Sequence, residues 1–286
     1  MPSLDALFDE LVKRGGGDLH LAAREPPIAR IRGQLQTLGD APLPAKELEE
    51  MLLDLVTPSQ RARLAADLDV EFAVAYKDVA RFRALYYVKH SGMAAAFRLV
   101  PARVPTLAEV AAPEVVRQVA ERRSGLIVVA GPSSCGKTTT VAAMIDHVNR
   151  TRACHVLTIE RAIEFLHEPE LAQITQREVG VHVPTVAAAL RSASRENADV
   201  VFVSELSSAE ELDLALRLAD DGALVLTTAR ANGVVSTVER LAGAFAPDVL
   251  PNVRARVADC LAGVVVQHLL RATDGKSLVA VHEVLV

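Results

Sequence analysis

The chain has 286 residues, half of them hydrophobic, and its 31 Lys+Arg against 36 Asp+Glu give a formal net charge of −5. This length exceeds the size at which a single hydrophobic core usually stops growing, so two domains are predicted. The acidic balance and only 3% aromatic residues argue against the basic surface and stacking platforms of nucleic-acid binders, and no nucleic-acid partner is expected.

Three further features bear on the cellular compartment. No apolar run reaches the roughly 18 residues of a membrane-spanning helix, and residues 1–5 lack the basic and apolar regions of a signal peptide. The three cysteines, Cys135, Cys154 and Cys260, are too few and too scattered for a disulfide framework or a zinc site. A cytoplasmic protein is therefore expected.

The first hundred residues mix helical and alternating patterns. Ser3 precedes apolar residues at helical spacing, and the glycines at 15–17 end that helix. The remaining patterns predict strands at 18–22, 28–31, 34–38, 70–76, 81–88 and 93–99, and helices at 43–56 and 58–66. We expect a compact α+β domain over residues 1–100, followed by a proline-bounded linker at 101–105.

The pattern changes beyond the linker. Thr106 and Glu109 have the spacing of a capping box, which predicts the start of a helix. Strands are then predicted at 125–130, 155–160, 199–204, 223–228, 262–269 and 278–284, and helices at 137–148, 185–195, 208–220, 234–245 and 248–259. This alternation predicts an α/β domain over residues 106–286, with a largely parallel sheet covered on both faces and a ligand at the carboxyl ends of its strands.

Residues 131–138 match the phosphate-binding loop G-x-x-x-x-G-K-[ST] at every fixed position. The match follows the apolar strand 125–130 and precedes a helix, which is the context that such a loop requires. Lys137 would reach the β- and γ-phosphates of ATP, and the Thr138 hydroxyl would hold Mg²⁺. The residues expected to bind the nucleotide here are Gly131, Pro132, Ser133, Ser134, Cys135, Gly136, Lys137, Thr138 and Thr139.

Two predicted strands end at an acidic residue. Glu160 follows the apolar run 156–159, and Glu205 follows the run 200–204. In a P-loop protein, an acid at the end of a neighbouring strand holds Mg²⁺ or polarises the attacking water. Either acid alone could be a solvated turn residue, but two such strands after a complete loop favour a functional pair.

Short motifs along nearly the whole chain give it a resemblance to a known family. The segments that carry it are 17–21, 80–83, 97–98, 155–160, 163–165, 176–179, 190–193 and 203–205. They resemble the PilT-like motor ATPases of type IV pili, within the wider type II/IV secretion ATPase superfamily. In particular, 155–165 is similar to the acidic "Asp box" of that family, H-I-L-T-I-E-D-P-I-E-F.

The resemblance implies a PAS-like N-terminal domain, a RecA-like ATPase core and a homo-hexameric ring that binds ATP between the two domains. It implies partners at the inner membrane, namely a pilus or secretion platform protein and possibly a related motor ATPase. Carried over by position, Lys137 and Glu160 act in catalysis, with Glu160 activating water, while Glu205 supports the metal and the water. Arg81, Arg83 and Arg98 would bring guanidinium groups to the γ-phosphate.

The chain also departs from the family pattern. Arg161 replaces an acid beside Glu160, Arg230 replaces the histidine of the T-L-H-T segment, and Ser134 stands at a P-loop glycine. Residues 206–208 replace M-R-D, and the family continues past the strand at 280–284 into helices tied to retraction. We expect Arg161 to lower the pKa of Glu160, because opposite charges within about 4–6 Å favour the ionised carboxylate. Hydrolysis could then be weak.

Several readings stay open at this point. The first is an ATP-hydrolysing motor subunit, and the second is a non-hydrolysing or weakly hydrolysing paralogue that regulates an active motor. A nucleic-acid translocase is disfavoured by the acidic charge balance. A small-molecule kinase would need a lid segment and an acceptor pocket, and neither is recognisable in the sequence. Cys135 carries a minor hypothesis, that its oxidation or alkylation blocks nucleotide entry, against a simple packing role.

Overall fold

The computed structural model describes residues 2–286 except 32, 78, 79, 102, 244, 246–249 and 274–277. The chain divides into two compact units, Met1–Ala102 and Arg103–Val286. Part of the predicted linker and the boundary between the helices predicted at 234–245 and 248–259 therefore lie outside the described residues. The two units are described separately.

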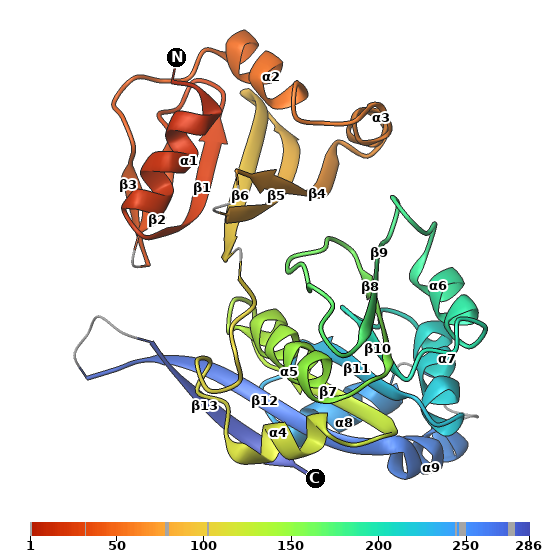
Figure 1. The fold of residues 1–286 in the computed structure, drawn as a ribbon. Helices are drawn as coiled ribbons and strands as arrows, with labels where there is room; N and C mark the ends of the chain where they lie inside the picture. The colour runs from red at the N-terminus through yellow and green to blue at the C-terminus, as the bar shows by residue number, and fades with distance from the viewer. Residues whose placement is uncertain are drawn as a thin grey trace. The chain divides into compact units, whose positions relative to one another are not determined.

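The first unit is a six-stranded antiparallel sheet with three helices packed on it (Figure 1). The strands run in the order β3-β2-β1-β6-β5-β4. Their bounds are β1 Gly16–Ala22, β2 Ile28–Ile31, β3 Gln34–Thr37, β4 Asp69–Tyr76, β5 Ala80–Lys89 and β6 Gly92–Pro101. The helices are α1 Leu4–Lys13, α2 Ala45–Leu53 and α3 Pro58–Asp67.

The core of this unit follows from the predicted periodicities. Ser3 caps α1 by accepting a hydrogen bond from the Ala6 N–H, and the apolar stripe of α1 faces the sheet. Phe8 of that stripe stacks on Phe82 of β5 with ring centroids 4.0 Å apart. Since alternate residues of a strand face opposite sides, Phe82 in the core leaves its neighbours Arg81 and Arg83 on the other face.

The second unit is a seven-stranded sheet in the order β13-β12-β7-β11-β10-β8-β9 (Figure 1). All neighbouring pairs are parallel except β12 and β13. The strands are β7 Gly125–Ala130, β8 His155–Glu160, β9 Gln173–Glu178, β10 Val200–Val203, β11 Leu224–Ala229, β12 Leu261–Arg271 and β13 Leu278–Leu285. The helices are α4 Glu114–Ala120, α5 Lys137–Thr151, α6 Val186–Ala193, α7 Ala209–Asp220, α8 Val234–Gly243 and α9 Leu250–Cys260.

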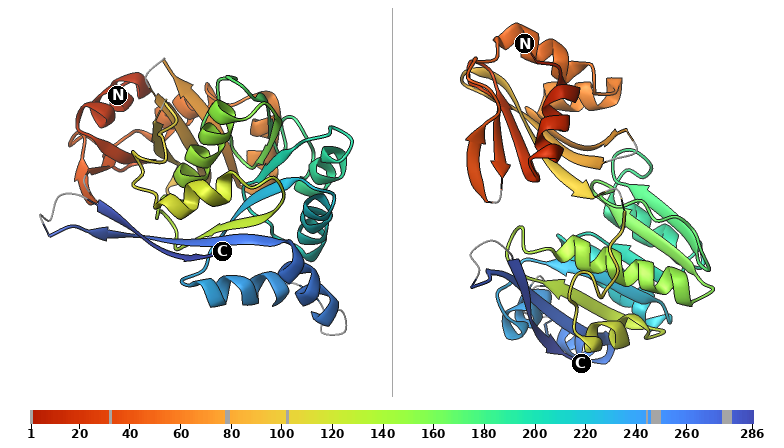
Figure 2. Two further views of the ribbon diagram at one scale, coloured as in Figure 1. Left: turned by 60° about the horizontal axis from the view of Figure 1, so that its bottom comes forward. Right: turned by 60° about the vertical axis from the view of Figure 1, so that its left-hand side comes forward.

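Helices cover both faces of this sheet, as the two views of Figure 2 show. The helices α4 and α5 pack on one face, while α6, α7, α8 and α9 pack on the other. Every residue of β7 and β10 is buried, which explains their uninterrupted apolar sequences. The predicted α/β class is confirmed. None of the described helices is long and apolar enough to cross a membrane.

One local prediction is wrong, and one strand was missed. Thr106 and Glu109 do form the hydrogen bonds of a capping box, but only one turn follows, and α4 begins later, after Pro113. Ala111 takes a positive φ of 52°, which ends the turn. The strand β9 was not predicted, because its sequence QITQRE has only one apolar residue. It is nevertheless a regular strand, paired in parallel with β8.

Candidate nucleotide-binding site

The phosphate-binding loop joins β7 to α5, as predicted. Both motif glycines are required by the local geometry. A Cβ on Gly131, at φ 148°, would lie 2.3 Å from the Gln267 carbonyl oxygen. A Cβ on Gly136, at φ 90°, would lie 2.8 Å from the Gln267 Nε2. The loop therefore closes tightly against β12 and delivers the N-terminus of the 15-residue helix α5, whose free N–H groups and dipole favour an anion.

Lys137 is the first residue of α5 and turns back over the loop. Its Nζ donates to the carbonyl oxygens of Gly131 at 2.9 Å and Pro132 at 2.7 Å. Burial lowers the pKa of Lys137 from its ordinary value. The ammonium group is thus held over the first residues of the loop, where the phosphate chain of a nucleotide would reach it.

Two side chains of the loop differ in their surroundings. Ser134 is exposed and has a φ of 62°, a left-handed conformation that favours glycine. Cys135 is only 3% exposed and lies 3.9 Å from the Lys137 Nζ. The burial of Cys135 supports its packing role over the proposed reactivity.

The carboxyl ends of four parallel strands form one edge of the sheet. Ala130 of β7 pairs with Ala229 of β11, and Val203 of β10 pairs with Ile159 of β8. The phosphate-binding loop, Arg230, Glu205 and Glu160 consequently follow one another along this edge, in strand order. The sequence placed the two acids at strand ends, and the structure has Glu160 as the last residue of β8 and Glu205 two residues after β10.

Glu160 is almost completely buried, at 4% exposure. Burial raises the pKa of its carboxyl group to about 7, because desolvation disfavours the charged form more than two hydrogen bonds favour it. Those bonds come to Oε1 from the Thr158 hydroxyl at 2.6 Å and from the Gln176 Nε2 at 3.3 Å. A carboxyl group with this pKa can accept a proton near neutral pH.

The expected influence of Arg161 on Glu160 is wrong. Arg161 is exposed, and its Nη2 donates to the Ser207 Oγ at 2.7 Å, so its charge is directed to Ser207. The pKa of Glu160 rises where a fall was expected, because burial decides it. Both 161 and 207 are positions at which the chain departs from the family pattern, and the contact shows that these two departures meet.

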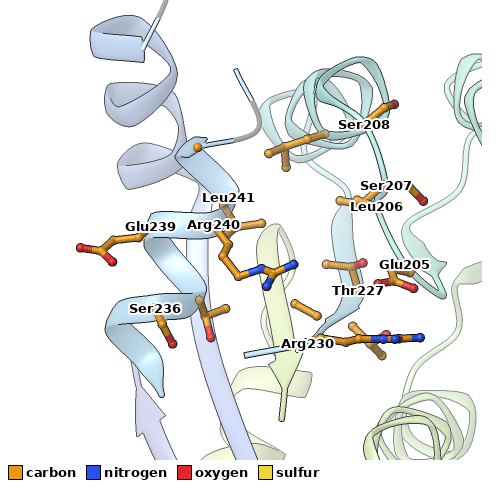
Figure 3. Close-up of a pocket in the computed structure, with 15 residues that line it drawn as sticks. Glu205, Leu206, Ser207, Ser208, Thr227, Arg230, Ser236, Glu239, Arg240 and Leu241 are labelled. Carbon is orange, nitrogen blue, oxygen red and sulfur yellow. The ribbon is translucent and has the colours of Figure 1, made fainter. Parts of the chain in front are cut away.

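A pocket of about 550 Å³ opens beside this edge, between the ends of β10 and β11 and the helix α8 (Figure 3). Figure 3 shows Arg240 directed from α8 toward Thr227 and Glu205, while Arg230 points away from α8. Thr227 is 1% exposed, and its hydroxyl has no hydrogen-bond partner among the described residues. The pocket thus brings Glu205, Arg230 and Arg240 to the lining of one cavity, at the carboxyl ends of β10 and β11.

The chemistry of the donor set fits Mg²⁺ bound together with a nucleotide. Thr138 offers a hydroxyl oxygen and Glu205 a carboxylate oxygen, which are ligands that a hard cation prefers. Among the described residues no group of three or more His, Cys, Asp or Glu could hold a metal alone. Phosphate oxygens and water would have to complete the coordination.

The three arginines of the resemblance lie on the same face of the first unit's sheet. Arg83 and Arg98 are directly paired across β5 and β6, and Arg81 is two residues from Arg83. Arg83 contacts Glu71, and the Arg98 Nε lies 2.8 Å from an Asp18 carboxylate oxygen. The Arg81 Nε is buried, with no hydrogen-bond partner among the described residues.

Sequence reasoning missed the polar residues that support the site. Gln176 bonds Glu160 from β9, and Gln267 bonds the phosphate-binding loop from β12. The sequence gives a signal for Gln267 only. This residue is the first polar one after the apolar run at 264–266, and a buried polar side chain there requires hydrogen-bond partners. Nothing in the sequence says which partners these are.

Comparison with known proteins agrees with this arrangement. Residues 2–283 match the family described as Type II/IV secretion system protein. The chain belongs to this family. It is 35% identical to the type IV pilus retraction ATPase PilT of Pseudomonas aeruginosa, over 96% of the chain and 79% of PilT. It is 37% identical to a twitching motility protein of Neisseria gonorrhoeae, over 99% of the chain and 75% of that protein.

The fold of this family member is also that of a solved relative. A crystal structure of the pilus retraction motor PilT with bound ADP has a TM-score of 0.90 and 33% identity, covering 100% of the chain and 83% of PilT. The family resemblance stated from the sequence is confirmed. The protein is a type IV pilus and secretion ATPase family member with a nucleotide-binding fold.

Proposed function

We propose that the protein is an ATP-hydrolysing subunit of a hexameric motor that serves type IV pili or a related secretion machine. The observation that carries this proposal is the sheet edge on which the Lys137 loop, Glu205 and the buried Glu160 follow one another. Similarity to PilT over nearly the whole chain supports it.

Each group has a role that its surroundings favour. The loop amides and Lys137 bind the phosphate chain of ATP, and Thr138 and Glu205 hold Mg²⁺, which neutralises charge on the phosphates when bound. Glu160 takes a proton from the attacking water, a role that a carboxyl pKa of about 7 suits. Arg81, Arg83 and Arg98 stabilise charge on the γ-phosphate when the ring assembles.

The same proposal extends to assembly and location. Six subunits form a ring, and movement of the two units during turnover drives the filament. The ring works in the cytoplasm, bound to an inner-membrane platform protein of the pilus or secretion machine. A related motor ATPase is a second candidate partner. No nucleic acid takes part, in line with the acidic charge balance.

A regulatory paralogue with little or no hydrolysis is the second candidate. Two cations favour it: Arg161 at the end of β8 and Arg230 at the end of β11 stand where the family pattern has an acid and a histidine. Either charge changes the field in which the γ-phosphate would react. The buried Glu160 with its raised pKa favours the hydrolase.

Phosphate release by the purified chain, measured with ATP and Mg²⁺ over a range of protein concentrations, separates the two candidates. The first predicts turnover that falls at least about 100-fold in Glu160→Gln and Glu205→Gln. Lys137→Ala should lose ATP binding in calorimetry. Tight ATP binding with background turnover, identical in the wild type and both carboxylate variants, would establish the regulatory paralogue.

A further inference from the structure

Gln267 contacts the phosphate-binding loop from the neighbouring strand β12. It is 3% exposed and uses both ends of its amide. Its Nε2 donates to the Cys135 carbonyl oxygen at 2.7 Å, and its Oε1 accepts from the Thr140 hydroxyl at 2.6 Å. These two partners flank Gly136 and Lys137, so one side chain fixes the chain on both sides of the residues that meet the phosphates.

His282 completes this contact from β13. It is paired directly opposite Gln267 in the antiparallel register, and its Nε2 lies 3.2 Å from the Gln267 Oε1. Because that oxygen can only accept, the Nε2 must carry the proton and donate. The amide orientation is then determined: its oxygen faces two donors and its nitrogen faces a carbonyl group.

The opposite face of the same hairpin reaches a second part of the site. Glu283, next to His282, accepts a hydrogen bond from the Val234 N–H at 3.1 Å, at the start of α8. His268, next to Gln267, lies with its Nε2 3.3 Å from the Asn232 carbonyl oxygen. The segment that follows Arg230 therefore rests on the hairpin that also supports the phosphate-binding loop.

We propose that Gln267 and His282 are positioning residues that hold the phosphate-binding loop in its nucleotide-binding shape, with Gln267 as the direct contact and His282 as the donor that orients it. This inference rests on the proposed function, since it concerns nucleotide affinity at the same loop. Neither side chain touches the nucleotide. Their effect passes through the Cys135 carbonyl group and the Thr140 hydroxyl.

Binding of ADP to the full chain, measured by calorimetry, tests the proposal. Gln267→Glu keeps the size of the side chain but faces the Cys135 carbonyl with an acceptor, and Gln267→Leu removes all three contacts. We expect each to weaken ADP binding about 10-fold, because a loop that is no longer held in place must be ordered when the ligand binds. His282→Phe should weaken it less than Gln267→Leu. Leu270→Ala, an exposed position on the same strand, should bind as the wild type does.

A double-mutant cycle distinguishes positioning from general destabilisation. Because Thr140 and Gln267 share one hydrogen bond, Thr140→Val should weaken ADP binding by itself but add less than about twofold in the Gln267→Leu background. Additive losses, or wild-type affinity in both Gln267 variants, would overturn the inference. If the wild-type chain itself binds no ADP, the proposed function fails instead. Circular dichroism shows whether each variant is folded, and Gln267→Glu serves if Gln267→Leu is not.

Discussion

At the residue scale, the buried carboxyl group of Glu160 makes the stability of the second unit depend on pH. Its pKa is raised from 4.5 to about 7 in the folded chain, so the folded state holds a proton that the unfolded state releases between these values. The resulting stabilisation is complete below pH 4.5 and is lost as the pH rises through 7. From 1.36 kcal/mol per pKa unit, the loss is about 3 kcal/mol.

Replacing Glu160 by Gln removes this titration. The Glu160→Gln protein should therefore gain stability over the wild type as the pH rises from 5 to 8, by up to about 3 kcal/mol. Thermal unfolding of both proteins at the two pH values measures the effect. An equal difference between the proteins at pH 5 and pH 8 would contradict the raised pKa.

Ser134 supplies a second prediction at this scale. A non-glycine residue in the left-handed region costs about 1 kcal/mol or slightly more, and Ser134 has a φ of 62°. Ser134→Gly should accordingly stabilise the chain by about 1 kcal/mol in denaturant unfolding. The adjacent Ser133, which is also exposed and has no positive φ, provides the control, because Ser133→Gly should bring no gain.

At the scale of elements, β9 holds the segment that follows β8. Gln176 of β9 donates to the Phe165 carbonyl oxygen at 2.9 Å and to Glu160, and it accepts from the His167 N–H at 2.9 Å. Gln176→Leu removes all three hydrogen bonds, leaving Glu160 only its bond from the Thr158 hydroxyl, and should destabilise the chain by about 2 to 3 kcal/mol. It should also raise the pKa of Glu160 further, which would shift the acidic limb of the rate profile to higher pH.

A pH–rate profile of the Gln176→Leu protein measures that shift. Gln176→Glu does not serve as the conservative variant, because a second carboxyl group would itself move the pKa of Glu160. Gln173→Leu, an exposed position on the same strand, is the matched control and should leave the profile unchanged. A destabilised Gln176→Leu protein with an unshifted profile would show that Gln176 supports the fold alone.

The elements that could be predicted are those whose local pattern and burial agree. The apolar run of β7, the loop motif and the helix α5 are consistent at each level, so sequence reasoning found them. The strand β9 lacks such a pattern, because its polar side chains are satisfied by partners on other elements. The pKa of Glu160 was wrongly predicted for the same reason: burial and the direction of Arg161 are tertiary properties.

At the scale of the whole molecule, the proposed ring makes turnover depend on assembly. Under the proposed function, Arg81, Arg83 and Arg98 close on ATP only in the assembled ring, so the turnover per subunit should rise with protein concentration. Replacing Arg81, Arg83 and Arg98 by Ala should lower turnover about 100-fold or more while ADP binding changes little. Sedimentation alongside the rate assay checks it, with Arg14→Ala as the control. Full activity of a monomer would contradict the proposal.

The tight approach of Gly131 to β12 has a consequence for how this protein could change through evolution. A methyl group there would collide with the main chain of Gln267 at 2.3 Å, whether or not a nucleotide ever binds. A descendant that had abandoned ATP would still be under selection to keep this glycine, for packing alone. Retention of Lys137, whose ammonium group satisfies no such steric demand, would be the better marker of a lineage that still uses the nucleotide.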